Sequence, residues 1–278
     1  MLTNFLHTYN PQPILIEIGP ISIYWYGLFM VLALFAGLLI SIRIAKWHGI
    51  KKDVIYDLFF YLIIGGFIGA RLFYVLYNVN YFWQNPVDII KIWQGGIAIH
   101  GALIFGILVL WWFARKHKFD FWKLSAIIAP GVALGQAIGR WGNYFNQELF
   151  GLPTDLPWGI PIALANRPEV FENFEYFHPT FLYESIGSLI VFIILLILHY
   201  YAVKRKKYLI FNIKYSIFIT LDYVLLYSIL RFFIEFIRID PTAGNIFGMR
   251  ATQGLSLAII ITSIIICVTA VFKDKKLT

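Results

Sequence analysis

The sequence has few charged residues and a single cysteine, and each scarcity excludes a class of protein. Charged residues make up 14% of the 278 residues, while hydrophobic residues make up 60%. Soluble globular domains average about 25% charged residues, so a water-soluble fold is not expected. Cys267 excludes an internal disulfide, and its place in an apolar run predicts a packing role.

The sequence also lacks the motifs of several enzyme classes. No pair of His, Cys or carboxylate residues has a metal-ligand spacing such as HExxH, and no GxSxG motif occurs. We therefore expect no metal, no cofactor and no serine-hydrolase chemistry. The first residues do not have the pattern of a signal peptide. No internal repeat or low-complexity stretch is found, which predicts a single membrane domain over residues 1–278.

Long apolar runs are abundant. The mean hydropathy is +0.73, and a helix needs about 20 mostly apolar residues to cross a bilayer. We therefore predict an all-α integral membrane protein with seven transmembrane helices. The apolar runs lie at about residues 21–42, 55–77, 96–114, 124–143, 180–203, 215–237 and 252–272.

Lysine and arginine residues lie mostly on one side of these predicted helices. Most of the 23 fall in the loops after the first, third and fifth helices and in the C-terminal tail. Positive residues collect in cytoplasmic loops, so we predict the N-terminus outside and the C-terminus in the cytoplasm. The formal net charge of +8 is then a signal of topology, and no nucleic acid partner is expected. The longest outer loop, residues 144–178, is predicted to form a small extracytoplasmic cap.

Polar residues within the predicted helices gather near the outer face of the membrane. A charged group inside lipid costs about 2.5–3.5 kcal/mol, so such positions are candidates for function. A conduction path would need polar groups through the whole depth, whereas this one-sided pattern predicts a cavity open to the outer leaflet. The residues at this level are Tyr26, Arg71, His100, Arg140, Asn143, Tyr183, Glu184, Arg231, Glu235, Gln253 and Ser256.

Two arginines and a histidine indicate what this level could bind. Guanidinium groups bind phosphate through paired hydrogen bonds and stay charged when partly dehydrated. Arg140 and Arg231 therefore indicate a phospholipid headgroup, and His100 can change its protonation near neutral pH.

Structural interpretations of the same residues remain open. Arg71 can pair with backbone carbonyl groups, and Arg140 can be held by Glu148 or Glu235. Glu235 lies one helical turn from Arg231 and three residues before Arg238, so it can pair with either arginine.

One stretch of the sequence resembles a known family. Residues 139–151 read Gly-Arg-Trp-Gly-Asn-Tyr-Phe-Asn-Gln-Glu-Leu-Phe-Gly, and this run is similar to the signature of prolipoprotein diacylglyceryl transferases. Departures from the family pattern occur at Ala102, at Phe181 and at Ile239-Asp240-Pro241, and none falls on a residue assigned to chemistry. Supporting elements are Trp25-Tyr26-Gly27, His100-Gly101, His178-Pro179-Thr180, Leu182-Tyr183-Glu184, Arg231-Phe232 and Gln253-Gly254-Leu255-Ser256.

The resemblance implies a reaction and a place for it. The diacylglyceryl group of phosphatidylglycerol moves to the lipobox cysteine thiol of a prolipoprotein signal peptide, which forms a thioether and releases glycerol phosphate. This is the first step of bacterial lipoprotein maturation. The resemblance places it in the plasma (inner) membrane, with the active site on the extracytoplasmic side. The substrate supplies the nucleophile, so the enzyme needs no cysteine of its own.

Residue roles follow as hypotheses. We expect Arg140 and Arg231 to hold the phosphate and stabilise the charge that grows on it as it leaves. His100 is expected to accept the thiol proton or to orient the headgroup. A lipid transporter or flippase with the same cavity is the alternative function, and a purely structural scaffold is a third. The remaining substrate-binding candidates are Tyr26, Asn143, Asn146, Glu148, Glu235 and Arg238.

Overall fold

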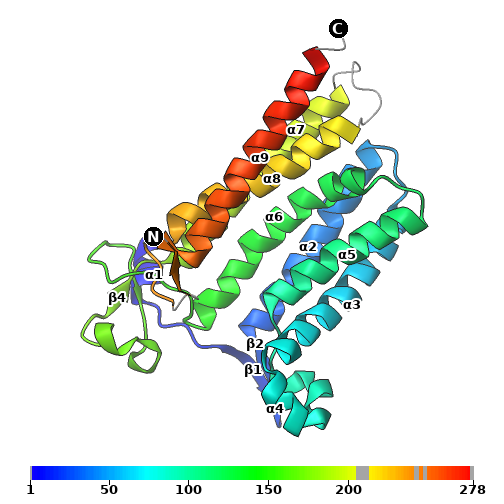
Figure 1. Cartoon of the computed structure of the whole chain (residues 1–278). Coiled ribbons are helices and arrows are strands. Elements are labelled where there is room, and N and C mark those ends of the chain that lie inside the picture. The colour runs from blue at the N-terminus through cyan, green and yellow to red at the C-terminus, as the bar shows by residue number, and fades with distance from the viewer. Residues whose placement is uncertain (1, 205–212, 241–243, 247–248, 276–278) are drawn as a thin grey trace.

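Seven long helices form the body of the protein, as the apolar runs predict. The computed structural model describes residues 2–204, 213–240, 244–246 and 249–275. All seven helices are long and apolar enough to cross a membrane, which confirms the predicted fold class (Figure 1). They are α2 (Trp25–Trp47), α3 (Lys52–Tyr77), α5 (Ile99–Lys116), α6 (Phe121–Phe145), α7 (Thr180–Lys204), α8 (Ile213–Ile234) and α9 (Ala251–Lys275).

Several helix boundaries differ from the sequence prediction, most clearly at the start of the first helix and the end of the sixth. The first helix begins at Trp25, since residues 21–24 belong to a hairpin of β1 (Ile14–Ile18) and β2 (Ile21–Tyr24). Gly19 turns this hairpin with φ +59°, a conformation that glycine adopts without strain. The sixth helix ends at Ile234, because residues 235–237 form a turn. A short hairpin of β5 (Asn245–Ile246) and β6 (Met249–Arg250) then precedes α9.

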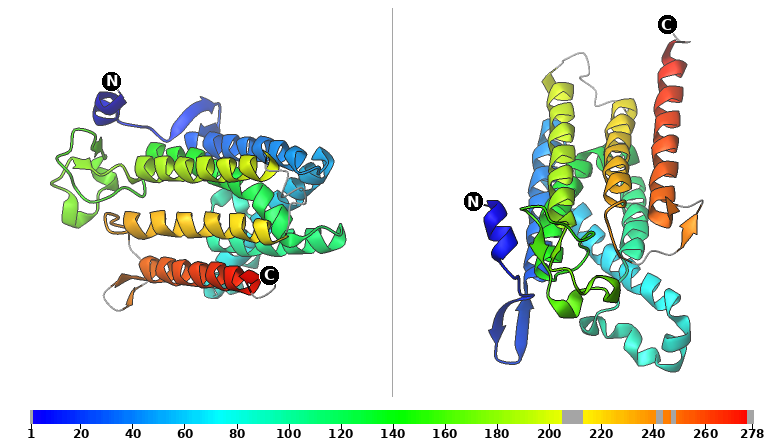
Figure 2. Two further views of the ribbon diagram at one scale, coloured as in Figure 1. Left: turned by 90° about the horizontal axis from the view of Figure 1, so that it is seen from above. Right: turned by 90° about the vertical axis from the view of Figure 1, so that its left-hand side faces the viewer.

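Helix α6 lies at the centre of the bundle. It contacts α2, α5, α7 and α8, while α3 pairs with α5 on one side and α9 pairs with α8 on the other (Figure 2). Small residues permit this packing: a Cβ atom added at Gly131 would lie 2.6 Å from the carbonyl oxygen of Gly37 in α2. The backbones of α2 and α6 therefore meet closely, as small residues allow in membrane proteins.

An arm of short helices connects α3 to α5, and Arg71 holds it in place. The arm consists of α4 (Val79–Gln84), η1 (Pro86–Ile90) and η2 (Ile92–Gln94). Arg71 donates to the carbonyl oxygens of Asp88 at 2.5 Å, Ile89 at 2.9 Å, Gly95 at 2.8 Å and Gly96 at 2.7 Å. The prediction that Arg71 can pair with backbone carbonyl groups is thus confirmed, because its guanidinium group donates to four of them.

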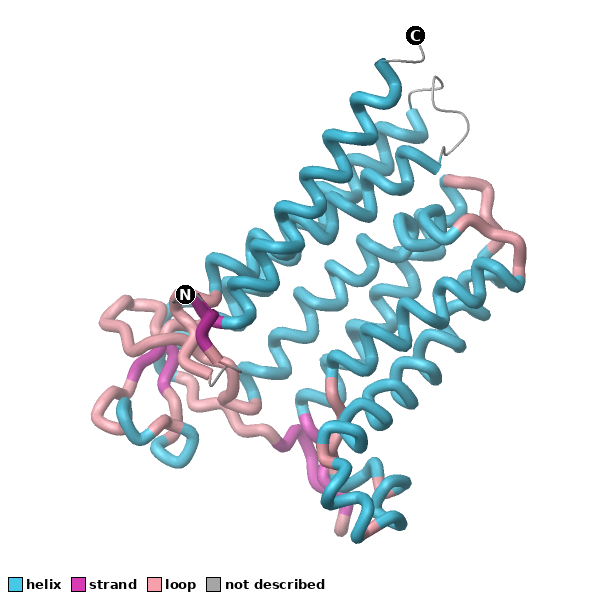
Figure 3. Tube along the Cα trace, in the orientation of Figure 1, coloured by secondary structure: helices cyan, strands magenta, loops and turns pink. Residues whose placement is uncertain are grey.

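The segment between α6 and α7 folds over the N-terminal helix α1 (Leu2–Thr8). It contains η3 (Leu164–Asn166), η4 (Glu169–Phe171), and a two-stranded sheet of β3 (Ile160–Pro161) and β4 (Tyr176–Phe177). Leu6 packs into one apolar cluster with Phe150, Ile162 and Phe177. Figure 3 shows this loop-rich unit at the same end of the bundle as β1 and β2. The N-terminal helix and the inter-helix loop therefore form one packed unit.

Gln147 fastens this unit to the end of α6. Its side-chain amide donates to Asn10 Oδ1 at 2.7 Å and to the Pro11 carbonyl at 2.9 Å. Its carbonyl oxygen accepts from the Ala163 backbone at 2.7 Å and from Asn166 Nδ2 at 3.3 Å. Gln147 has φ +49°, which is unfavourable for a residue with a side chain, and these four hydrogen bonds offset that cost.

A histidine pair ties the helices together at the opposite end. His48 Nε2 lies 2.9 Å from His199 Nδ1, and His199 Nε2 lies 3.0 Å from the carbonyl oxygen of Ala126. Burial and the nearby Lys123 ammonium lower the pKa of His48 to about 4. The contact joins the end of α2 to α7 and α6.

Candidate active site

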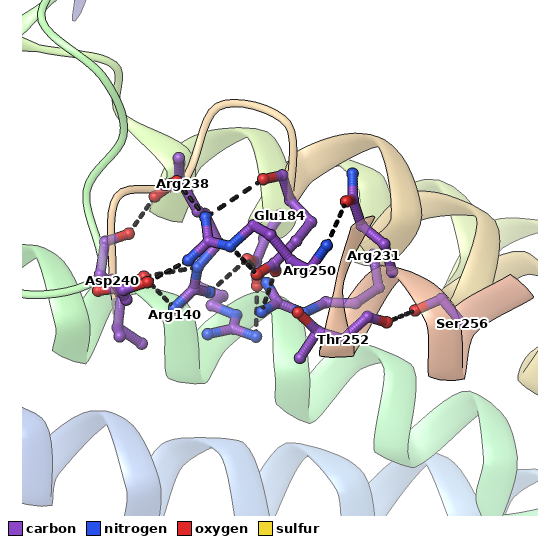
Figure 4. A network of polar contacts seen from close by, with 12 residues as sticks. Arg140, Glu184, Arg231, Arg238, Asp240, Arg250, Thr252 and Ser256 are labelled. Carbon is purple, nitrogen blue, oxygen red and sulfur yellow. Dashed lines mark hydrogen bonds and ion pairs between the residues drawn. The ribbon is translucent and has the colours of Figure 1, made fainter. Parts of the chain in front are cut away.

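A single buried carboxylate, that of Glu184, gathers three arginines from different parts of the chain. Glu184 lies in the first turns of α7, and its side chain is 4% exposed. Its Oε1 atom lies 2.9 Å from Arg231 Nη1 and 3.1 Å from Arg238 Nη1. Its Oε2 atom forms an ion pair with Arg140 Nη2 (Figure 4). Residues separated by up to 98 positions thus meet at one point.

Two further carboxylates extend the network around the end of α8. Glu235, 1% exposed, pairs with Arg231 Nη2 at 2.7 Å and with Arg250 Nε at 3.0 Å. Asp240 Oδ2 accepts from Arg238 Nε at 2.7 Å and lies 2.5 Å from its Nη2 atom. Buried charges are stable only when they are paired in this manner.

The arginines differ in how much of each is open to a ligand. The side chain of Arg140 is 20% exposed and that of Arg231 is 18% exposed, whereas that of Arg238 is 7% exposed. Arg238 also directs all three of its nitrogen atoms at carboxylates, of Glu184 and Asp240. Arg140 and Arg231 are therefore the partly open pair on Glu184, and Arg238 is positioned to orient that carboxylate.

The loop that follows α6 folds back toward Arg140. Asn143 Nδ2 donates to Glu148 Oε1 at 2.7 Å, and Asn146 Nδ2 makes a longer contact with the same oxygen at 3.5 Å. Arg140 Nη1 donates to Asn143 Oδ1 at 3.4 Å. Glu148 therefore orients the amide of Asn143, which in turn contacts the arginine, and Arg140 pairs with Glu184 rather than with Glu148 or Glu235.

Two tyrosines lie beside Arg140. Tyr26 packs against Gly142, where an added Cβ atom would lie 2.8 Å from the Tyr26 ring. Tyr227 of α8 and Tyr26 both lie near enough to Arg140 to interact with its charge. The two hydroxyl groups add neutral polar atoms to a site that otherwise consists of charges.

His100 lies outside this network. Its side chain is exposed in the first turn of α5, and its ring lies 5.8 Å from that of Phe73, between centroids. Within the part of the chain that the structure describes, no hydrogen bond or ion pair joins His100 to the arginines or carboxylates. The same described residues contain no group of three His, Cys, Asp or Glu side chains that could hold a metal ion.

Comparison with known proteins identifies the family to which this arrangement belongs. The family model described as prolipoprotein diacylglyceryl transferase matches residues 13–269. The chain belongs to this family. A phosphatidylglycerol–prolipoprotein diacylglyceryl transferase from Trichormus variabilis is 46% identical over 253 residues, covering 91% of this chain and 87% of the relative. Proteins of the same name from Parasynechococcus marenigrum and Acaryochloris marina are 41% and 46% identical, covering 90% and 89% of this chain and 88% and 86% of the relatives.

The sequence of this transferase does not identify the residue at the centre of the site, which is Glu184. The sequence places Glu184 among the outer-level residues and in the Leu182-Tyr183-Glu184 element, but it indicates no role for this carboxylate. The sequence also gives no indication of roles for Tyr227, Asp240 and Arg250. Their participation depends on contacts between separate helices and loops, which residue spacing does not reveal. Glu235 pairs with Arg231 but not with Arg238 among the described contacts.

Proposed function

We propose that this protein transfers the diacylglyceryl group of phosphatidylglycerol to the lipobox cysteine thiol of prolipoproteins, as its family name states for its relatives. The observation that carries the proposal is the partly exposed pair Arg140 and Arg231 on the buried carboxylate of Glu184. A guanidinium pair held by a buried carboxylate is preorganised to bind a phosphate group.

The reaction needs positive charge at the phosphate. The cysteine sulfur bonds to the terminal glycerol carbon of the diacylglyceryl group, and the bond from that carbon to the phosphate oxygen breaks with its electron pair left on oxygen. The phosphodiester thereby becomes a phosphomonoester that carries additional negative charge. Arg140 and Arg231 stabilise this charge as it develops, which lowers the barrier to transfer.

The thiol proton needs an acceptor, and His100 is our candidate. Its exposed position on α5 leaves its imidazole nitrogens accessible to a substrate. Because a thiol has a pKa near 8.5, a base raises the fraction of reactive thiolate. His100 either takes this proton or orients the headgroup.

The other site residues position the arginines and the headgroup. Glu148 and Asn143 orient Arg140 through their hydrogen bond of 2.7 Å. Tyr26 and Asn146 complete the headgroup contacts, and Glu235 holds Arg231. Arg238, with its guanidinium group between two carboxylates, contributes to substrate binding by fixing Glu184.

The protein is a multi-pass membrane protein with bacterial relatives. We place it in the plasma (inner) membrane as a single domain, with residues 144–178 as a cap on the extracytoplasmic side. The lysine and arginine distribution supports this orientation. The lipid substrate then comes from the outer leaflet, and the signal peptide presents its lipobox cysteine on the same side.

A transfer assay with a matched pair of variants tests the proposal. Purified protein, phosphatidylglycerol and a synthetic lipobox peptide should yield glycerol phosphate and a peptide heavier by one diacylglyceryl group. Arg140→Lys keeps the charge but loses the paired donors, so transfer should fall at least about 100-fold. Arg167→Lys, in the loop before α7, should leave the rate unchanged. Wild-type protein without either product, or near-normal transfer by Arg140→Lys, would contradict the proposal.

A further inference from the structure

Arg250 joins the site from a position outside all the sequence motifs. It is the last residue of β6, directly before α9, and its side chain is 20% exposed. Its Nε atom lies 3.0 Å from Glu235 Oε1. Its Nη1 atom donates to the Arg238 carbonyl and its Nη2 atom to the Asp240 carbonyl. One side chain thus binds both a carboxylate of the site and the backbone that follows α8.

The backbone that Arg250 binds carries two site residues. Backbone carbonyl groups outside helices and sheets need hydrogen-bond partners, and a guanidinium group supplies charged donors for them. Arg250 binds the carbonyls of residues 238 and 240, a few positions after the last residue of α8, Ile234. The same segment presents Glu235 to Arg231 and presents Arg238 to Glu184. By holding this segment in place, Arg250 positions Glu235 against Arg231 and Arg238 against Glu184.

Arg250 also sets the charge of the ion-paired cluster. With Arg250, the guanidinium groups exceed the carboxylates by one, and this matches the single negative charge of a phosphodiester. Without Arg250 the two kinds of charge cancel, and no positive charge is left over for the substrate. The guanidinium groups are those of Arg140, Arg231, Arg238 and Arg250, and the carboxylates are those of Glu184, Glu235 and Asp240.

We propose that Arg250 is a positioning residue that keeps Arg231 available to the substrate phosphate by sharing the charge of Glu235. The carboxylate of Glu235 is 1% exposed, and its oxygens face one arginine each. If Arg250 is removed, Arg231 is the one arginine that still pairs with the Glu235 carboxylate. A buried charge that has lost one partner binds its remaining partner more strongly. Arg231 then turns from Glu184 and the phosphate toward Glu235. The inference rests on the proposed transfer reaction.

Steady-state kinetics of three variants test this role. Arg250→Gln should raise the KM for phosphatidylglycerol at least about tenfold, the scale expected when a buried charge pair loses one partner. The KM for the lipobox peptide should stay within about twofold, because the effect acts on the phosphate site. Arg250→Lys keeps the charge, so its KM for phosphatidylglycerol should stay within about threefold of wild type.

The double variant Arg250→Gln/Glu235→Gln provides the decisive comparison, since it removes both charges and restores the surplus. Its KM for phosphatidylglycerol should fall below that of Arg250→Gln. Arg167→Gln is the control, because Arg167 also donates to loop carbonyls, those of Ile162 and Glu172, but is not part of the ion-paired cluster. It should leave both KM values unchanged.

Several results would overturn the inference. The first is an unchanged KM for phosphatidylglycerol in Arg250→Gln, and the second is an equal rise of the KM for phosphatidylglycerol and the KM for the peptide. The third is a KM for phosphatidylglycerol in the double variant that is as high as in Arg250→Gln. If Arg250→Gln does not accumulate in membranes, Arg250→Lys decides alone, and a tenfold rise in its KM for phosphatidylglycerol overturns the role. Wild-type protein without transfer counts against the proposed function, whereas normal wild-type transfer with unchanged variant kinetics counts against Arg250 only.

Discussion

Replacement of Glu184 by glutamine should destabilise the protein far more than the loss of one ordinary contact. Glutamine keeps the size of the side chain and removes its charge, so Arg140, Arg231 and Arg238 lose the carboxylate that holds them together. Removing one partner of a buried ion pair costs about 3–5 kcal/mol. At about 2–4 °C per kcal/mol for a chain of comparable size, we expect the Tm of Glu184→Gln to fall by roughly 6–20 °C.

The single cysteine provides the assay. Cys267 is a free thiol on α9, so a thiol-reactive fluorogenic dye reports unfolding of the detergent-solubilised protein during a thermal ramp. Inorganic phosphate should raise the Tm of Glu184→Gln more than that of the wild type, because an added anion can replace the missing carboxylate. Glu169→Gln, an exposed carboxylate of η4, is the control. A Tm within about 2 °C of wild type for Glu184→Gln would refute the reasoning, since that shift corresponds to less than about 1 kcal/mol.

Two further predictions concern His100 and Arg71. His100→Asn should lower the rate of transfer and flatten its pH dependence near neutrality, because asparagine accepts no proton; an unchanged rate and pH profile would rule out His100 as the base. Arg71→Met removes donors to four carbonyl groups, each hydrogen bond to a charged group being worth about 1.5–3 kcal/mol. Hydrogen exchange should therefore rise in residues 86–97 and stay unchanged in residues 180–190, and equal exchange in wild type and variant would contradict this role.

The helices of this protein were predictable because hydropathy alone decides which segments can cross lipid. All seven apolar runs became helices, and the main boundary error arose where Ile21 to Tyr24 pair with β1 instead of starting α2. Backbone hydrogen bonding between two short strands competes with helix formation there. A hydropathy pattern contains no information on that competition.

The sequence predicts which arginines and carboxylates lie among the polar residues of the helices, but it does not predict how they pair. Arg71 and Arg140 have the same charge and a similar predicted depth, yet the structure binds Arg71 to the backbone of the arm and pairs Arg140 with Glu184. The difference depends on the side of each helix that meets its neighbours, which a single sequence does not specify when the helix is apolar all round. The central place of Glu184 has the same origin, because its three partners come from other segments.

The contacts of Gln147 have a consequence for the order in which the chain assembles. Asn10 and Gln147 lie 137 positions apart in the sequence, and α2, α3, α5 and α6 are synthesised between them. The first residues of the chain must therefore remain unattached, on the side of the membrane where Gln147 will emerge, until four helices have been inserted. Signature residues Asn146 and Glu148 flank Gln147, so the earliest part of the chain is attached directly beside the signature.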